Sequence, residues 1–456
     1  MNIRVLIIGI ASYFVASNFT NLTMYENLSV SFFVFILVSF IDNLGKKLVV
    51  LDIPILIAII TCLLLPIAGY HYFNQSNLLA RSWFYFMRVP SEEYYSFMFP
   101  ATVAMAIGLK LPIFFRTQTY QHHEQYLINA KTYLSNTKWQ GLILVAIGLI
   151  SSVLQNFAPG ALAHIFFLMK YLMFVGVFYC LYSNFPNKRI ILFLVFGLMV
   201  GRSISSGMFG ELVFMGTMSI ILIVLGIKMH FLSKATIIIL GLFSLLILQA
   251  VKPAFRKETW SGKNDGNKLS ILTDMMSQKI MDPSLLLENE TALFGLYGRF
   301  NQGMIVSRVL KAVPSRFPYA NGETIFLSVA SSVVPRILWP TKPESGGKAN
   351  FERFLGVRLK KVSYGLSPFG EAYGNFGKTG GIIFMLFFGL LFNFFSFLLL
   401  KLAVRWPSLI LWFPYLFFYA TSIETDVVTM LNSFTKAAIF TFIMYKFFPK
   451  VFKLKL

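Results

Sequence analysis

The chain has little charge, little cysteine and none of the common nucleotide-binding or metal-binding motifs. Only 13% of its 456 residues are charged, whereas an average soluble domain carries about 25%. Its two cysteines, Cys62 and Cys180, both fall in apolar windows, which argues against a disulfide framework or a thiolate metal site. No Walker loop, dinucleotide fingerprint, HExxH or CxxC pair stands in a credible context, so phosphate binding by an ATP-type motif is not expected.

Long apolar windows are what the chain has in abundance, and 56% of its residues are hydrophobic. Each such window could cross a hydrocarbon layer about 30 Å thick, where a backbone must satisfy its own hydrogen bonds by forming a helix. The sequence therefore predicts an all-α polytopic membrane protein with about twelve transmembrane helices. The predicted spans are 3–17, 28–41, 50–68, 94–113, 139–156, 160–182, 189–204, 208–227, 234–251, 380–400, 407–423 and 429–447.

The net charge of +21 is divided among many loops rather than gathered in a soluble domain, so no nucleic-acid partner is expected. If the N-terminus is cytoplasmic, short outer loops hold only Arg81, Arg88 and Arg202. This asymmetry follows the positive-inside rule and predicts that both termini are cytoplasmic. The inner side then receives Lys46, Lys47, Arg116, Lys131, Lys138, Lys188, Arg189, Lys228, Lys234, Lys401, Arg405 and the tail residues Lys446, Lys450, Lys453 and Lys455.

This orientation places the long loop 252–379 outside. The loop carries 18 Lys/Arg against 10 Asp/Glu, which leaves it at +8, and polar loops of such length are usually functional or disordered. The expected organisation is nine spans in 1–251, this loop, and three spans with a basic cytoplasmic tail in 380–456. Within the loop, GETIFLSVASSVVPRILWP is too short for a span and predicts an interfacial or re-entrant helix that Pro335 ends.

The segment VPRILWPTKPES, Val334 to Ser345, is rigid and cationic. Its three prolines fix three φ angles, and Trp339 carries a ring of the kind that settles at the headgroup level of a membrane. Arg336 and Lys342 would then lie at the depth of lipid phosphates, which guanidinium groups bind well. A general anchor on anionic headgroups is the alternative interpretation.

Carboxylates near cations are candidates for acid–base chemistry. Glu371, in SYGLSPFGEAYGNFGKTGG, is a candidate general base, although it could equally pair with an arginine and close a turn. Glu424 and Asp426, in SIETDVV, are expected to pair with Lys436 or an outer arginine, because a site for a divalent cation needs more oxygens.

Two cations in predicted spans need a partner or water. Arg202, in VGRSISSGMFGE, stands at the outer end of a span among small residues that leave space for a ligand, and Glu211 is its expected partner. Lys170, in the middle of a span, should face the interior of the bundle. In the long loop, Arg256 and Arg299 stand out because aromatic neighbours could bury them.

The order PRILWPTKP followed by GLSPFGEAYGNFG resembles the Wzy-type O-antigen and oligosaccharide repeat-unit polymerases of bacterial inner membranes. The resemblance covers about residues 297–381 and is supported by Gly201-Arg202 and the acidic segment Glu424 to Asp426. It implies a GT-C-like glycosyltransferase that joins undecaprenyl-pyrophosphate-linked repeat units on the periplasmic face, with no cofactor and no obligatory metal. Membrane lipids and a chain-length regulator are the further partners to consider.

The resemblance also implies roles for the residues. Fixed cations would stabilise the leaving pyrophosphate, the work that a metal does in other transferases, and a carboxylate would take the acceptor proton. The catalytic residues are then Glu371, Arg202 and Arg336, the pyrophosphate-binding residues Arg256, Arg299 and Lys342, the glycan-binding residues Trp339, Tyr364 and Tyr373, and the alternative acids Glu424 and Asp426.

Two other functions use similar features. An O-antigen-ligase-like enzyme would share the donor but is expected to use an outer-loop histidine, and residues 252–379 contain none. A lipid-linked oligosaccharide flippase or other transporter would also have about twelve spans and a cationic cavity. Transporters often show two related halves, whereas here one half holds the entire long loop.

Overall fold

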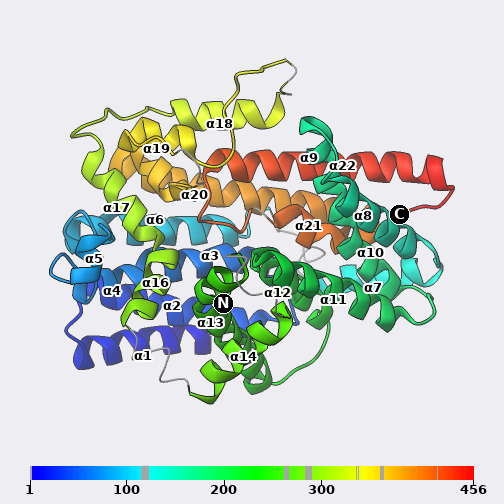
Figure 1. The fold of residues 1–456 in the computed structure, drawn as a ribbon, viewed down its shortest axis with the longest axis horizontal. Helices are drawn as coiled ribbons and strands as arrows, with labels where there is room; N and C mark the ends of the chain where they lie inside the picture. Colours follow the sequence, from blue (N-terminus) through cyan, green and yellow to red (C-terminus); the bar gives the residue numbers. More distant parts are fainter. Residues whose placement is uncertain are drawn as a thin grey trace.

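The computed structural model describes residues 3–114, 123–260, 267–282, 290–334, 336, 338–359, 364–418 and 420–456, and these residues contain helices but no β-strand. The first half of the chain forms the helices drawn from blue to green in Figure 1. These are α1 Ile3–Phe19, α2 Met24–Asn43, η1 Val49–Leu51, α3 Asp52–Ile59, η2 Ile60–Leu64, α4 Leu65–His71, α5 Leu78–Ser82, α6 Ser91–Lys110, α7 His123–Ser135, α8 Gln140–Leu154, α9 Gly160–Lys170, α10 Leu172–Tyr182, α11 Lys188–Ser206 and α12 Gly210–Val224.

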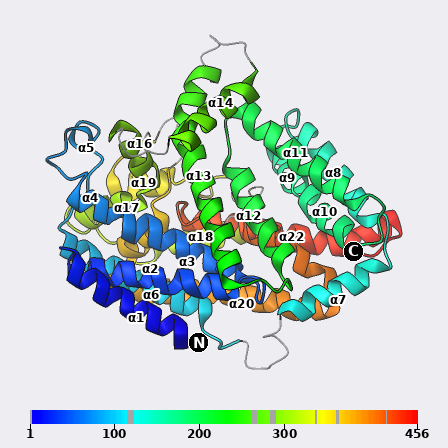
Figure 2. The ribbon, with the colours of Figure 1, turned by 90° about the horizontal axis from the view of Figure 1, so that it is seen from below.

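The second half begins with a long helix that stands out from the side of the bundle together with the helix after it (Figure 2). Its helices are α13 Phe231–Trp260, α14 Lys268–Met281, α16 Glu290–Phe300, α17 Gln302–Ala312, α18 Glu323–Val333, α19 Lys348–Leu355, α20 Ser367–Arg405, η4 Pro407–Trp412, α21 Phe413–Phe417 and α22 Val427–Phe452. A helix is confirmed where the sequence predicts one in the long loop, as α18. The loop boundaries predicted at 252 and 379 both lie inside helices, α13 and α20.

Among the described residues, seven helices are long and apolar enough to cross a membrane, or eight if the bent pair α7–α8 is one span. Each of the twelve predicted windows contains a helix, but the number that could span is smaller than predicted. Three windows form apolar helices of 17 residues or fewer, namely α1, α12 and η4–α21. α6 has 20 residues and begins with the polar stretch SEEYYS, and α8 bends by 96° from α7.

The connections between helices meet in two groups. In one group, which we call the tail end, Lys234 Nζ donates to the Asp42 carbonyl (3.2 Å) and Tyr133 Oη donates to the Leu456 carbonyl (2.8 Å). In the other, the loop end, the Arg88 amide donates to Ser307 Oγ (3.1 Å). The described loops at Asp42, Leu48, His123, Tyr133 and Lys234, which are predicted to be cytoplasmic, thus converge with the C-terminus at the tail end, and the long loop packs at the loop end.

Glycines allow the central helices to approach closely. α6 and α20 cross at Gly108 and Gly389, where a Cβ atom would overlap backbone atoms of Leu386 and Met105 respectively. Small residues at helix crossings are typical of membrane bundles, because close backbone approach gains van der Waals contact that lipid cannot replace. This crossing fixes α20, and with it the part of the chain that carries Glu371.

Gly108→Ala is expected to lower the stability of the folded chain by about 2–4 kcal/mol, because the rigid Leu386 backbone must move to admit the methyl group. Thermal unfolding in detergent measures the effect. Gly197→Ala is the matched control, since a Cβ atom on Gly197 would meet nothing within 4 Å and alanine favours a helix over glycine. Equal midpoints for the two variants would contradict the close crossing.

A wider turn interrupts the third predicted span. Residues Ile60–Leu64 form a π-helical turn, which leaves backbone carbonyls without their usual helical donors. Tyr94 Oη and Tyr95 Oη on α6 donate to the carbonyls of Cys62 (2.7 Å) and Leu63 (2.6 Å). Both tyrosines are fully buried, so α6 satisfies the backbone of the irregular turn inside the bundle.

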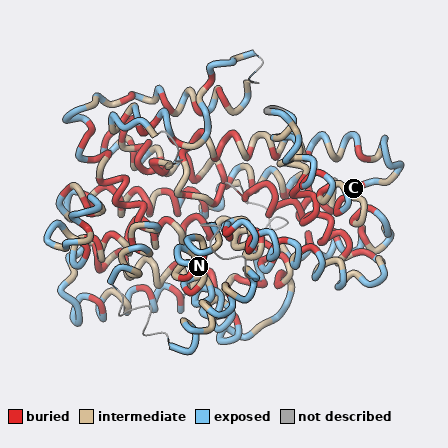
Figure 3. The backbone as a smooth tube through the Cα atoms, viewed as in Figure 1, coloured by how far each residue is buried: buried red, intermediate tan, exposed pale blue. Residues whose placement is uncertain are grey.

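The buried residues run through the middle of the bundle (Figure 3). Many outer helices expose apolar side chains. Only 11% of the most apolar window of α13 is buried by the rest of the protein. Contiguous apolar surface of this kind usually marks contact with a membrane or a partner. Together with the length of the seven helices, it agrees with an all-helical membrane protein.

Candidate functional site

Four basic side chains lie at the loop end, and we call them the cation cluster: Lys252, Arg256, Arg299 and Arg308. Lys252 and Arg256 are one turn apart on α13, so they share a face of that helix. Both are close enough to Arg299 on α16 to interact with it electrostatically. Like charges held close together bind anions well.

Arg256 is held in place by the end of a neighbouring helix. Its Nε donates to the Gly207 carbonyl (2.8 Å), and its guanidinium lies 4.7 Å from the ring centre of Trp260. Gly207, with φ +64°, ends α11, and a cation is favoured beside the carbonyl end of a helix. These two contacts position Arg256, and among the described residues no carboxylate forms an ion pair with it.

Tyr364 lies between two members of the cluster. Its hydroxyl is close enough to interact with Arg299 and with Arg308, and burial, followed by the neighbouring Tyr85, raises its pKa to about 12. Arg308 donates through Nη2 to the Phe84 carbonyl (2.7 Å), while its Nε is buried with no hydrogen-bond partner among the described residues. The phenol therefore stays protonated near neutral pH and can donate a hydrogen bond to an anion.

Glu424 brings a carboxylate to the cluster. It is half-buried near Arg299 and Lys252, and burial raises the pKa of its carboxyl although both cations, Arg299 first, act to lower it. Its loop is fixed because the backbone of Gly365 packs against Glu424 and Thr425, where a Cβ atom would clash. Glu424 therefore lies beside several cations and is more basic than a free glutamate.

Glu371 and Asp426 form a buried joint rather than an open site. Glu371 is 0% exposed, and its Oε1 accepts from the Val427 amide (2.7 Å) while its Oε2 has no hydrogen-bond partner among the described residues. Asp426 caps α22 by accepting from the Thr429 amide (3.1 Å) and also accepts from the Gly347 amide (2.9 Å). Burial raises the pKa of Asp426, and these hydrogen bonds oppose the rise.

The two cations of the VPRILWPTKPES segment lie apart from the joint. Lys342 is buried, and its Nζ donates to the carbonyls of Ser331 (2.7 Å) and Val334 (2.8 Å), so it caps the C-terminus of α18. Burial, then Arg336, lowers the pKa of Lys342. Arg336 donates to the Pro340 carbonyl (3.0 Å) and is half exposed, and Trp339 is partly buried.

The expected pairing of Arg202 with Glu211 is wrong. Glu211 Oε2 forms an ion pair with Lys170 Nζ (2.8 Å), and Lys170 is 5% exposed, which confirms that this lysine faces the interior. Arg202 is exposed on α11, and no described acid forms an ion pair with it. Tyr373, predicted to bind glycan, packs edge-on against Phe97 with ring centres 5.1 Å apart.

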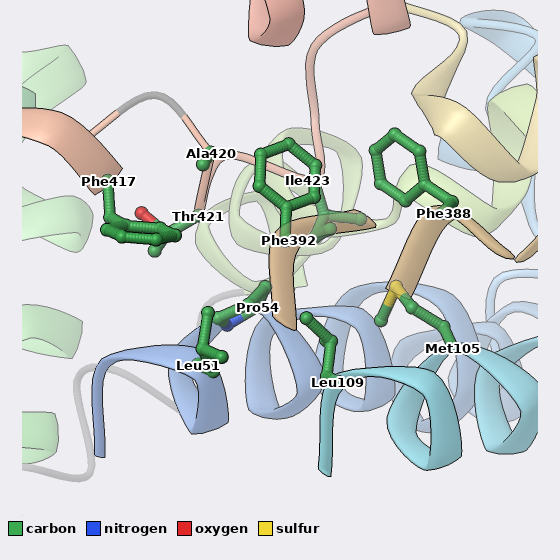
Figure 4. Close-up of a pocket in the computed structure, with 10 residues that line it drawn as sticks. All are labelled: Leu51, Pro54, Met105, Leu109, Phe388, Phe392, Phe417, Ala420, Thr421 and Ile423. Carbon is green, nitrogen blue, oxygen red and sulfur yellow. The ribbon is translucent and has the colours of Figure 1, made fainter. Parts of the chain in front are cut away.

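An apolar pocket lies between α3, α6, α20 and the chain that leads to Glu424. Figure 4 shows its lining, in which Thr421 is the only residue with a polar side chain, so it offers no acid–base group. It is therefore a gap in the apolar packing near Glu424 rather than a site for chemistry. The lining residues are Leu51, Pro54, Met105, Leu109, Phe388, Phe392, Phe417, Ala420, Thr421 and Ile423.

Residues 63–402 match the family described as a domain of unknown function, DUF8712. The chain belongs to this family. No curated protein and no solved structure matches it. The DUF8712 match contains the whole cation cluster and Glu371, whereas Glu424 and Asp426 lie beyond its end.

In this DUF8712 protein, the structure brings Arg256, Arg299, Tyr364 and Glu424 together, although they come from four separate segments. It also adds Lys252 and Arg308, which the sequence alone did not select. Lys252 could have been selected from the sequence, because its i, i+4 spacing from Arg256 puts both on one face of a helix. Arg308 gave no such signal, because its neighbours Tyr85 and Tyr364 are distant in sequence.

Proposed function

We propose that the protein is a glycosyltransferase that polymerises lipid-pyrophosphate-linked oligosaccharide repeat units at the surface of a bacterial inner membrane. The observation that carries this proposal is the cation cluster with Glu424 and Tyr364 at the loop end. A site that expels a pyrophosphate needs concentrated positive charge, and a site that activates a hydroxyl needs a base. Both lie here within electrostatic reach of each other.

In the proposed reaction, an acceptor hydroxyl of one repeat unit attacks the anomeric carbon of the glycan on the other lipid. The new glycosidic C–O bond forms as the bond from the anomeric carbon to the pyrophosphate oxygen breaks, and the lipid pyrophosphate leaves with that electron pair. Glu424 takes the hydroxyl proton. Lys252, Arg256 and Arg299 stabilise the charge that develops on the leaving oxygen, and Tyr364 and Arg308 donate to the phosphate oxygens.

Glu424 replaces Glu371 as the proposed base for a geometric reason. A general base must come within hydrogen-bond reach of the proton that it removes. Glu371 is fully buried under the start of α22, whereas Glu424 is partly exposed beside the cations. Arg202 stays a proposed contact to the lipid-linked substrates, whereas Arg336 and Lys342 lie apart from the cation cluster, beside the C-terminus of α18.

We place the loop end on the periplasmic side and the tail end on the cytoplasmic side. The basic loops that converge at the tail end support this orientation through the positive-inside rule. The seven helices that are long and apolar enough then cross the bilayer, and the five other predicted windows, which are shorter, bent or more polar, pack beside them. A periplasmic site needs no nucleotide sugar, because its donor arrives already activated on the lipid.

Incubation of the purified protein with a lipid-pyrophosphate-linked repeat unit tests the proposed function. We expect a ladder of products that differ by one repeat unit on a gel, with release of the lipid pyrophosphate. A single transferred block on a different acceptor would favour a ligase. Movement of the intact lipid-linked unit between leaflets without new glycosidic bonds would favour a flippase, and either result would overturn the polymerase.

A further inference from the structure

Residues 323–334, 336 and 338–347 form a hairpin whose two ends lie at the start of α22. Just before its beginning, the Gly322 amide donates to Asn375 Oδ1 (3.1 Å) on α20. Asn375 lies one turn after Glu371, and Glu371 accepts a hydrogen bond from the first amide of α22. At its end, the Gly346 and Gly347 amides donate to Thr429 Oγ1 (3.1 Å) and Asp426 Oδ2 (2.9 Å). The chain between these points leaves the loop end and returns to it.

The tip of the hairpin reaches Lys436. α18, its first arm, packs along α22 (Figure 1), and Lys342 Nζ closes the tip by binding the carbonyls of Ser331 and Val334. Lys436 is close enough to interact electrostatically with both Lys342 and Arg336. It lies nine residues after Val427, about 14 Å along the helix from the loop end. The hairpin thus places Arg336 and Lys342 near Lys436.

This charge is poorly compensated within the protein. Among the described residues, Lys436 forms no ion pair with any acid, and the acid nearest to Arg336 is Glu344, 4.0 Å away and itself 72% exposed. An unpaired lysine in a spanning helix costs about 3 kcal/mol on insertion scales, and such residues usually mark a functional site. Among the described residues Lys342 and Lys436 therefore have no ion-pair partner, and the partner of Arg336 is exposed and distant.

A small pocket lies beside Lys436. His164 and Tyr171 line it from one side, and Ser433 and Ala437, which flank Lys436 on α22, line it from the other. Tyr415 also lines it, is 5% exposed, and has a buried hydroxyl with no hydrogen-bond partner among the described residues. The pocket therefore combines aromatic walls with a free hydroxyl, next to uncompensated positive charge.

We infer that Arg336, Lys342 and Lys436 form a second anion site, which binds the phosphate of an anionic membrane lipid that enters from the bilayer. The lipid source is favoured because Phe326, Val329 and Val333, on one face of α18, are 71%, 49% and 67% exposed and would face acyl chains if the hairpin is re-entrant. The cationic tip then lies below the headgroup level, where a phosphate bound by guanidinium and ammonium groups replaces the missing acid. The site lies apart from the cation cluster and does not depend on the proposed polymerase activity.

The test uses the purified full chain in neutral detergent with added phosphatidylglycerol, and with phosphatidylcholine and inorganic phosphate in parallel. We expect phosphatidylglycerol to raise the thermal midpoint, and Lys436→Gln and Arg336→Gln each to weaken its apparent affinity about 10-fold. Lys450→Gln, at the exposed far end of α22, is the matched control and should bind normally. Without lipid, Lys436→Gln should be at least as stable as the natural chain, because like-charge repulsion is removed.

The outcomes separate the explanations. If Lys436→Gln and Lys450→Gln bind phosphatidylglycerol equally well, the cations only contact headgroups in general and the site does not exist. If inorganic phosphate gives the same stabilisation at the same concentration, the site takes a free anion and the lipid assignment is wrong. If Lys436→Gln unfolds, Arg336→Gln decides, because Arg336 is half exposed outside the helices and its loss leaves the packing intact.

Discussion

Arg299→Gln is expected to slow repeat-unit polymerisation about 100- to 1,000-fold, the size of effect seen when one donor to a developing oxyanion is removed. Arg299 is the member of the cation cluster that interacts with the most partners, since Lys252, Arg256, Tyr364 and Glu424 all lie within its electrostatic reach. Its loss removes charge where the pyrophosphate leaves, so kcat should fall more than KM rises. Initial rates with a fixed donor concentration measure both constants.

Lys311→Gln is the matched control for Arg299→Gln. Lys311 is exposed on α17. Its substitution removes one positive charge from the long loop, as Arg299→Gln does, so the net charge of the loop falls equally. We expect its rate to stay within twofold of the natural chain. If both variants lose activity alike, the loop attracts its anionic substrate in a general way and the cation cluster is not the place where the pyrophosphate departs.

Much of the fold could be predicted from hydropathy, because each apolar window does contain a helix. The number of spans could not be predicted in this way, since the length of each helix depends on tertiary contacts. For example, α12 ends at Val224, where the Gly226 amide binds the Gly45 carbonyl (2.8 Å) in a turn that no local pattern announces. The helix before Pro335 was predictable because proline at that point stops a helix. Its return to α22 depends on Asp426, far along the chain.

The site was harder to predict than the fold. Glu371 stood out because glycines surround it, yet those glycines serve close packing: Gly374, for instance, lies against the ring of Phe354. Lys342 was expected to serve phosphate binding alone, but two of the three donors of its ammonium bind carbonyls at the end of α18. Glu424 became the better candidate for the base only when the structure placed it beside Arg299, a residue 125 positions earlier. Such pairings are invisible without tertiary structure.

Glu424→Gln is expected to lower the polymerisation rate about 1,000-fold, within the range that general bases contribute. In the natural chain the rate should fall as the pH drops through the raised pKa of Glu424, because the protonated carboxyl cannot accept the hydroxyl proton. Arg299 stabilises the charged carboxylate, so in Arg299→Gln the pKa should rise further and the acid limb of the residual activity should move to higher pH. Rate profiles from pH 4 to 9 would show this shift.

Stability measurements separate catalysis from misfolding in the Glu424→Gln chain. Folding raises the pKa of Glu424, so between the unfolded and folded pKa values the folded chain binds more protons, and its stability falls as the pH rises through that window. Glu424→Gln has no carboxyl to titrate here, so it does not lose this stability. At neutral pH it should unfold at the same temperature as the natural chain, or at a higher one. Glu371→Gln should leave the acid limb in place, since that carboxyl is buried in the α20–α22 joint. An acid limb that disappears in Glu371→Gln but persists in Glu424→Gln would instead assign the base to Glu371.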